Sequence, residues 1–210
     1  MKRRSFIKTS AAGLVAPTAL VSNDSKPIKN RVRKPIAIST WNHGLPANDA
    51  AMSILRQNGS ALDAVEVGVR VPEADPESQS VGYGGRPDKD GHVTLDACIM
   101  DSFGNAGAVA FLRDIKHPIS VARKVMEQTD HVMLVGKGAK KFALAHGFEE
   151  ENLLTKKSRD EWLRWKEDHR IKDSWGPNEE HDTISTLAID NNGDMAGACT
   201  TSGMAYKIHG

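Results

Sequence analysis

The peptide bond between Asp182 and Thr183 lies where two kinds of sequence meet. A polar stretch containing Gly176 and Pro177 precedes it, and the apolar, partly β-branched run 184–189 follows it. This change predicts a loop that enters a buried strand, with a hydroxyl residue at the strand entry. If the chain were cut at this bond, Thr183 would carry a free α-amine beside its own hydroxyl. One residue would then supply both the nucleophile and the base.

Two interpretations of this bond follow from the residues alone. An α-amine titrates at about 7.7 to 8.0, so near neutral pH part of it is unprotonated and accepts the hydroxyl proton. The alternative is that this Asp-Thr pair only marks the point where a loop enters a strand, because such pairs are common there. The residues around the bond are therefore needed to choose between these interpretations.

Three short motifs around this bond resemble the glycosylasparaginases, also called aspartylglucosaminidases. They are His181–Ile184, Ala188–Asp190 and Gly197–Gly203. Members of that family are N-terminal nucleophile hydrolases, made as inactive precursors that cut themselves before a threonine. The resemblance covers about 35–210 and implies an α+β fold, the four-layer αββα sandwich of that superfamily, with helices outside two central sheets.

The resemblance also implies the residues of a catalytic site. Thr183 becomes the nucleophile, Thr201 supports its hydroxyl or amine, and Ser80 lies close to it. Trp41, at the end of an expected strand, lines the substrate pocket, although a tryptophan in this position is also a common core residue. Asp182 and His181 belong to the self-cleavage site, where Asp182 assists proton transfer.

Two other polar segments are interpreted as structural. The glycine-rich string Ser80–Pro87 lacks the lysine of a phosphate loop and opens no helix, so its glycines serve close backbone approach. Asp96 is expected to be a carboxylate satisfied within the sheet. The acidic run Glu73–Glu77 is expected to be a solvated loop.

The reaction implied is hydrolysis of the side-chain amide of N-acetylglucosaminyl-asparagine, without cofactor or metal. An isoaspartyl peptidase or asparaginase of the same superfamily is an alternative. Its processing site usually has glycine before the threonine, so Asp182 with His181 favours the glycosylasparaginase reaction. A catalytically incompetent fragment or binding module is a further alternative, because the family continues past Gly210 with substrate-binding and oxyanion residues. The implied partners are the chain's own C-terminal β-subunit portion and a heterotetramer of two α and two β chains.

Composition and charge exclude several other classes of function. The 210 residues carry 28 Lys and Arg against 27 Asp and Glu, with a net charge of +1, so no basic field for nucleic acid exists. The eight histidines form no His-x-x-x-His pair, and the sequence contains no Cys-x-x-Cys metal motif. Cys98 and Cys199 lie in apolar strand-like runs and are expected to be buried free thiols.

The N-terminus resembles a twin-arginine export signal, with Arg3 and Arg4 ahead of a short apolar run. A fortuitous basic start is the alternative. An exported protein of this kind is expected in the periplasm, with no membrane attachment after export. The expected organisation is a signal at 1–22, a loose basic segment at 23–34, an α-subunit-like region at 35–182 and the start of a β-subunit-like region at 183–210.

Strands and helices are expected at regular intervals along 35–210. Hydrophobic periodicity predicts helices for 47–58, 60–70, 117–128, 136–145 and from 158 onward, with Ser60 capping the second and Ser120 capping the third. It predicts strands for 35–41, 93–100, 106–111, 131–135, 183–189 and 195–202, and the short strand 131–135 is expected to be buried. An Asn-Gly turn between the last two strands predicts a hairpin that brings Thr200 and Thr201 near Thr183.

Overall fold

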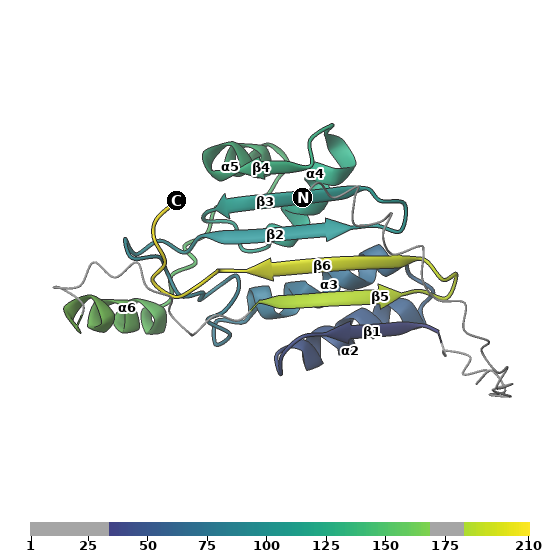
Figure 1. The fold of residues 1–210 in the computed structure, drawn as a ribbon, viewed down its shortest axis with the longest axis horizontal. Coiled ribbons are helices and arrows are strands. Elements are labelled where there is room, and N and C mark those ends of the chain that lie inside the picture. Colours follow the sequence, from purple (N-terminus) through teal and green to yellow (C-terminus); the bar gives the residue numbers. More distant parts are fainter. Residues whose placement is uncertain (1–33, 169–182) are drawn as a thin grey trace, which may run out of the picture. The chain divides into compact units, whose positions relative to one another are not determined.

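A mixed β-sheet organises the computed structural model, which describes residues 34–168 and 183–210. Within these residues the strand order is β1-β5-β6-β2-β3-β4 (Figure 1). All neighbours pair antiparallel except β3 and β4, which are parallel. The strands are β1 (Ile36–Ser39), β2 (Leu95–Met100), β3 (Ala106–Leu112), β4 (Met133–Val135), β5 (Ile184–Ile189) and β6 (Met195–Thr201).

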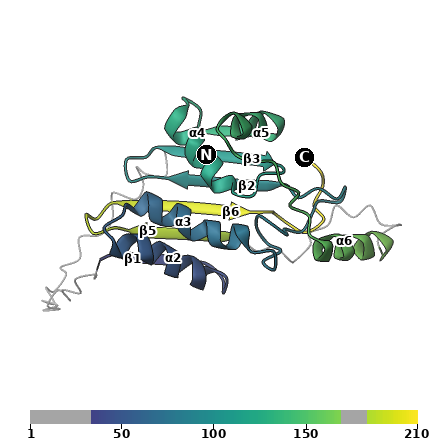
Figure 2. The ribbon, with the colours of Figure 1, turned by 180° about the vertical axis from the view of Figure 1, so that it is seen from behind.

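Helices cover one face of this sheet. Figure 2 shows α2, α3, α4 and α5 in front of the strands, whereas α6 lies near the loops beyond the strand ends. The helices are α2 (Gly44–Arg56), α3 (Ala61–Ala74), α4 (Pro118–Gln128), α5 (Gly136–Ala145) and α6 (Lys156–Asp168). None of the helices among the described residues combines the length and the apolar character that a bilayer crossing requires.

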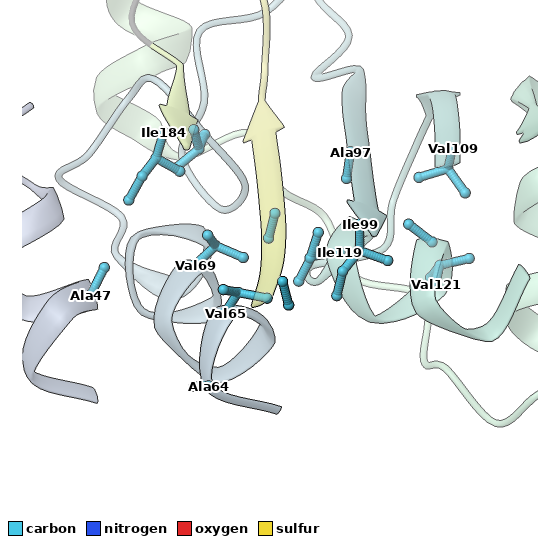
Figure 3. Packing of buried hydrophobic residues seen from close by; sticks show 14 of the residues in the cluster. Ala47, Ala64, Val65, Val69, Ala97, Ile99, Val109, Ile119, Val121 and Ile184 are labelled. Atoms are coloured by element: carbon cyan, nitrogen blue, oxygen red, sulfur yellow. The ribbon is translucent and has the colours of Figure 1, made fainter. Parts of the chain in front are cut away.

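Alternation along the strands determines which side chains meet the helices. In β2, Leu95, Ala97 and Ile99 are buried, while Cys98 and Met100 point to the other face. Ala97 and Ile99 pack with α2, α3, α4 and α5 in one core cluster, part of which Figure 3 shows, whereas Leu95 belongs to a second cluster with Val93 and Leu153. Gly107 lets α4 approach β3 closely, because a Cβ there would lie 2.1 Å from the Ala122 carbonyl oxygen.

The opposite face of the sheet carries no helix among the described residues. Large apolar side chains are exposed there, and a hollow of about 810 Å³ lies over them. Residues of four strands, β1, β2, β5 and β6, and of the loop after β2 line it, including Ile38, Met100, Leu187, Met195 and Phe103. The α+β class expected from the sequence is confirmed, and the described residues supply one helical layer and one sheet of the four expected layers.

Local signals in the sequence explain several element boundaries. The Ser60 hydroxyl accepts the backbone N–H of Asp63 at 3.1 Å, which caps α3 as its sequence predicts. The Asp190 carboxylate accepts the N–H groups of Asn192, Gly193 and Asp194 and closes the β5–β6 hairpin. Its second oxygen accepts the N–H of Ala61, which ties the hairpin to the start of α3.

Three details differ from the expectations. The strand β4 is largely exposed rather than buried, because it lies at the sheet edge and pairs with β3 alone. Ser120 does not cap α4, since its hydroxyl donates to Glu66 of α3 instead. Helix α3 continues beyond Arg70 to Ala74 with Pro72 near its last turn.

Candidate active site

The two candidate hydroxyls meet across the β5–β6 hairpin. Ile184 pairs with Thr200, so the same antiparallel register continued by one residue places Thr183 opposite Thr201. This confirms the expectation that the Thr200–Thr201 end approaches Thr183. Because alternate residues share a face, Thr201 belongs with Cys199 to the face that the helices leave open. A nucleophile at Thr183 would therefore stand at an accessible end of the sheet.

Thr40 fixes the backbone on the C-terminal side of Thr183. Its hydroxyl donates to the Thr183 carbonyl oxygen at 3.0 Å and accepts the Ser185 N–H at 3.0 Å. Its own N–H donates to the Ser185 carbonyl, also at 3.0 Å. Sequence reasoning missed this residue, since a threonine at a strand end is unremarkable until the pairing of β1 with β5 is known.

Trp41 follows Thr40 and is exposed, with 59% of its surface accessible. Trp41 is therefore not part of the core that the described residues form. Its φ of +62° lies in the left-handed region, which a bulky side chain rarely adopts. Such backbone conformations persist where the surrounding contacts impose them and are frequent at functional sites. Here the N–H of Gly44 closes a turn on the Trp41 carbonyl at 3.1 Å.

Ser80 is buried beside the end of β6. Its carbonyl oxygen accepts both the N–H and the hydroxyl of Ser202, at 2.9 and 2.8 Å. The glycine loop approaches the same region, because a Cβ on Gly85 would lie 2.7 Å from the Ser202 Cβ. The loop glycines therefore allow close backbone approach, as expected. The two hydrogen bonds hold Ser80 beside Ser202, the residue that follows Thr201 in the chain.

Asp96 lies on β2 opposite Thr201. Its carboxylate accepts the backbone N–H of Phe111 at 2.8 Å, next to a register shift between β2 and β3. The role expected from the sequence, a carboxylate satisfied within the sheet, is confirmed. Phe111 itself has φ +53°, so this contact also helps to hold a strained turn at the strand end.

Lys207 is a half-buried cation close to the same end of β6. Its ammonium group donates to the carbonyl oxygen of Ser202 and, at 3.4 Å, to that of Thr94. Burial lowers the pKa of Lys207, while the carboxylates of Asp96 and Asp88 act in the opposite direction. Sequence reasoning missed this lysine, because nothing in its neighbourhood along the chain distinguishes it from a surface lysine.

Glu73 lies directly beneath the candidate site, on the face that the helices cover. It is fully buried in α3, so the expectation of a solvated loop for Glu73–Glu77 is wrong for Glu73, whereas Asp75–Glu77 are exposed as expected. Its carboxylate accepts the Thr200 hydroxyl at 2.8 Å and the Ile119 N–H at 3.2 Å, and it contacts His117 Nδ1 at 3.1 Å. Burial raises the pKa of Glu73, although these three contacts oppose the change.

The backbone of Glu73 holds the glycine loop as well. Its carbonyl oxygen accepts the Tyr83 N–H at 2.7 Å, and a Cβ on Gly82 would lie 2.2 Å from that oxygen. Glu73 therefore connects α3, the start of α4, strand β6 and the loop after Ser80. It positions the strand that carries Thr201.

Two candidate residues, His181 and Asp182, lie outside the described residues. Within 34–168 and 183–210, no group of three or more His, Cys, Asp or Glu side chains is arranged to hold a metal ion. The arrangement thus offers paired hydroxyls, a half-buried lysine and ordered backbone groups, which suit nucleophilic attack on a carbonyl.

A sequence profile described as Asparaginase matches residues 37–210. The chain belongs to this asparaginase family. The match includes β1 with Trp41, the glycine loop and the whole β5–β6 hairpin. The candidate site is therefore built entirely from the part of the chain that carries the family pattern.

Three curated relatives of this chain share one name. A protein from Elizabethkingia miricola named N(4)-(beta-N-acetylglucosaminyl)-L-asparaginase is 54% identical over 99% of this chain and 62% of its own length. A Mus musculus protein of the same name is 40% identical over 84% of this chain and 60% of its own. A putative one from Drosophila grimshawi is 35% identical over 98% and 61%. The chain spans about three fifths of the length of these relatives.

Proposed function

We propose that the protein is a glycosylasparaginase in which Thr183, freed by self-cleavage after Asp182, is the N-terminal nucleophile. The observation that carries this proposal is the β5–β6 register, which brings Thr183 opposite Thr201 on an accessible strand end. The family match and the shared name of the curated relatives support the same activity.

In the first stage the precursor cleaves itself. The Thr183 hydroxyl attacks the Asp182 carbonyl carbon, and the peptide C–N bond breaks as an ester C–O bond forms. Water then hydrolyses the ester, which leaves a carboxylate on Asp182 and a free α-amine on Thr183. The Asp182 carboxyl and His181 assist the proton transfers. Thr40 keeps the Thr183 carbonyl in place while the bond on its other side reacts.

In the second stage the free Thr183 acts on substrate. Its α-amine takes the hydroxyl proton, and the oxygen attacks the side-chain amide carbon of N-acetylglucosaminyl-asparagine. The glycosylamine leaves with a proton, and water resolves the acyl-enzyme to aspartate. Thr201 holds the Thr183 hydroxyl or amine, Ser80 supports that strand end, and Trp41 forms a wall of the substrate pocket. The carbonyl contacts of Lys207 keep the turn after β6 closed.

The partners and location follow from the same proposal. The α-subunit-like part, 35–182, and a β-subunit beginning at Thr183 stay together after cleavage, because β5 remains paired with β1 and β6 remains paired with β2. Two such pairs form a heterotetramer. The leader 1–22, which lies outside the described residues, directs export to the periplasm by the twin-arginine route.

Intact mass of the full-length gene product tests the first stage. We expect two fragments that separate between Asp182 and Thr183. Thr183→Val, which keeps the side-chain shape but removes the hydroxyl, should remain uncut, whereas Thr183→Ser, which keeps a hydroxyl, should still cleave. An uncut wild-type chain with a cooperative unfolding transition would overturn the nucleophile assignment.

Substrate competition tests the second stage. The ratio of kcat/KM for N-acetylglucosaminyl-asparagine to that for an isoaspartyl dipeptide should favour the glycosylated substrate at least tenfold. A ratio favouring the dipeptide would assign the cleaved enzyme to the isoaspartyl peptidase branch. A cleaved protein that acts on neither would favour the incompetent or binding alternative.

A further inference from the structure

Gln79, which directly precedes Ser80, has an unusual backbone conformation. Its φ of +44° lies in the left-handed region, which residues other than glycine, asparagine and aspartate seldom adopt. Only 8% of its surface is exposed. A strained conformation of this kind persists only where the surrounding contacts impose it. The contacts of Gln79 therefore show what holds the start of the glycine loop in place.

Helix α6 holds the side chain of Gln79. The amide nitrogen Nε2 of Gln79 donates to Glu161 Oε2 at 2.8 Å and to Ser158 Oγ at 3.3 Å. A glutamine amide has two N–H donors, so these two bonds use both of them. The two acceptors are three residues apart on α6 and therefore lie on the same face of the helix. That face ties Gln79 to the helix.

Helix α6 is itself docked on the segment that follows Gln79. The Ser158 hydroxyl donates to the Gly84 carbonyl oxygen at 2.5 Å, and Ser158 is fully buried there. The indole N–H of Trp162 donates to the Lys89 carbonyl oxygen at 3.1 Å. Because these bonds reach backbone groups on both sides of the loop's end, α6 is fixed against the loop and can hold Gln79 in one position.

The backbone of Gln79 leads to the strand that carries Thr201. The Gln79 carbonyl oxygen accepts the Arg86 N–H at 2.9 Å, which closes the glycine loop on itself. The carbonyl oxygen of the next residue, Ser80, accepts the two hydrogen bonds from Ser202. Since φ and ψ are the soft dihedral angles of a residue, a change of these angles at Gln79 would swing the Ser80 carbonyl away from Ser202. The end of β6 would then lose this support.

We propose that Gln79 is a positioning residue for the hydrolysis, an inference that rests on the proposed function. Its hydrogen bonds to α6 hold Gln79 in the left-handed conformation, and this conformation keeps the Ser80 carbonyl on Ser202. Thr201, the neighbour of Ser202, is thereby held opposite Thr183. Gln79 acts through these residues and not on the reacting atoms.

Two substitutions in the full-length gene product test this role. Gln79→Met keeps a long side chain but donates no hydrogen bond, so the left-handed conformation is no longer held. We expect the rate of self-cleavage, the kcat of the cleaved enzyme, or both, to fall at least fivefold. Gln79→Gly also donates no bond, yet glycine adopts positive φ without an anchor. It should be at least threefold faster than Gln79→Met in the step that Gln79→Met slows.

The helix side of the contact gives an independent test in which the loop sequence is unchanged. Glu161→Met removes the nearer acceptor of Gln79 and should slow the same step as Gln79→Met. Glu167→Met is the matched control, because Glu167 is an exposed glutamate of the same helix, and both of its rates should equal those of the wild type. Intact mass follows self-cleavage, steady-state kinetics give kcat, and unfolding curves show that each variant is folded at the temperature used.

The outcomes separate this role from the proposed function and from a purely stabilising role. A wild-type protein that stays uncut, or that is cut and inactive, contradicts the proposed function. With an active wild type, falls below fivefold in both rates for Gln79→Met overturn the positioning role, and so does a glycine variant less than threefold faster. A purely stabilising contact would lower the stability of both variants but leave the rates of folded protein unchanged. If Gln79→Met does not fold, Glu161→Met carries the test with the same fivefold limit.

Discussion

The two faces of the sheet differ in what covers them and in which side chains they present. On the covered face, small and branched apolar side chains pack against four helices around one buried carboxylate, Glu73. On the open face, the same strands present hydroxyls, thiols and exposed apolar groups. Neighbouring residues of one strand therefore differ in role because the side-chain period is two. The covered face fixes the strand positions, and the open face carries the candidate chemistry.

The largest difference in stability effect between the two faces should appear when two neighbouring residues of β2 are each replaced by alanine. Ile99 is 1% exposed in the core, whereas Met100 is 51% exposed on the open face. Ile99→Ala should lower the free energy of unfolding by about 2 to 5 kcal/mol, because it leaves a cavity. Met100→Ala should change it by less than about 0.5 kcal/mol. Urea unfolding measures both, and equal costs would show that the open face is packed in the whole protein.

Substitution of Glu73 should have the next largest effect on the free energy of unfolding, because its carboxylate is a buried hydrogen-bond acceptor on the covered face. Glu73→Ala leaves the Thr200 hydroxyl and the Ile119 N–H without their acceptor, which should cost about 1 to 3 kcal/mol for each unsatisfied group. Glu73→Gln keeps an acceptor oxygen and should cost less. Equal unfolding free energies for the two variants would contradict the hydrogen-bonding role.

Glu73→Gln should also change the pH dependence of stability. Burial raises the folded-state pKa of Glu73 above its ordinary 4.5, so the folded protein keeps a proton that the unfolded chain has released. Stability from this group is complete below 4.5 and is lost as pH rises through the folded-state pKa. The glutamine variant should lack this decline. Parallel slopes in unfolding free energy against pH would contradict the assigned shift.

Thr40 links the edge strand to the site and should give a smaller change in stability. Thr40→Val removes its hydrogen bonds to Thr183 and Ser185, at a cost of about 0.5 to 1.5 kcal/mol at this exposed position. We expect self-cleavage to slow as well, while Thr40→Ser keeps both bonds and the rate. Time courses of cleavage, followed by intact mass, measure this rate. Unchanged rates for both variants would show that Thr40 does not contribute to self-cleavage.

Trp41 should matter least for stability. Because its ring is exposed, Trp41→Ala should shift the unfolding free energy by less than about 0.5 kcal/mol. The same change should raise KM for glycosylated asparagine several-fold if the ring forms a pocket wall. Steady-state kinetics of the cleaved enzyme separate these effects. A large loss of stability with unchanged KM would make Trp41 a structural residue.

Much of the site could be read from local sequence. The Asn192-Gly193 turn determines the β5–β6 hairpin and its register, and these bring Thr183 and Thr201 together. Ser60 marked the start of α3, and the glycine loop marked a close backbone approach. These features were predictable because turn chemistry, capping and glycine conformation depend on residues only a few positions apart.

The residues that sequence reasoning missed owe their roles to contacts with distant parts of the chain. Glu73 looked solvated because its neighbours along the chain are acidic, yet its partners Thr200, Ile119 and His117 come from distant segments. Thr40 meets Ser185 only through strand pairing, and Lys207 is partly buried because the folded chain brings it to the carbonyl groups of Thr94 and Ser202. Their roles depend on contacts between residues far apart in sequence, which no local pattern specifies.

The sequence by itself determined the hairpin, the helices and the family to which the chain belongs, since each rests on short-range pattern. Only the tertiary structure decided which face of each strand is covered, and therefore that Cys98 and Cys199 face outward as a pair while Glu73 is buried. The physical reason is that alternation fixes two faces for every strand, but the helices that pack against one of them decide which face loses its water.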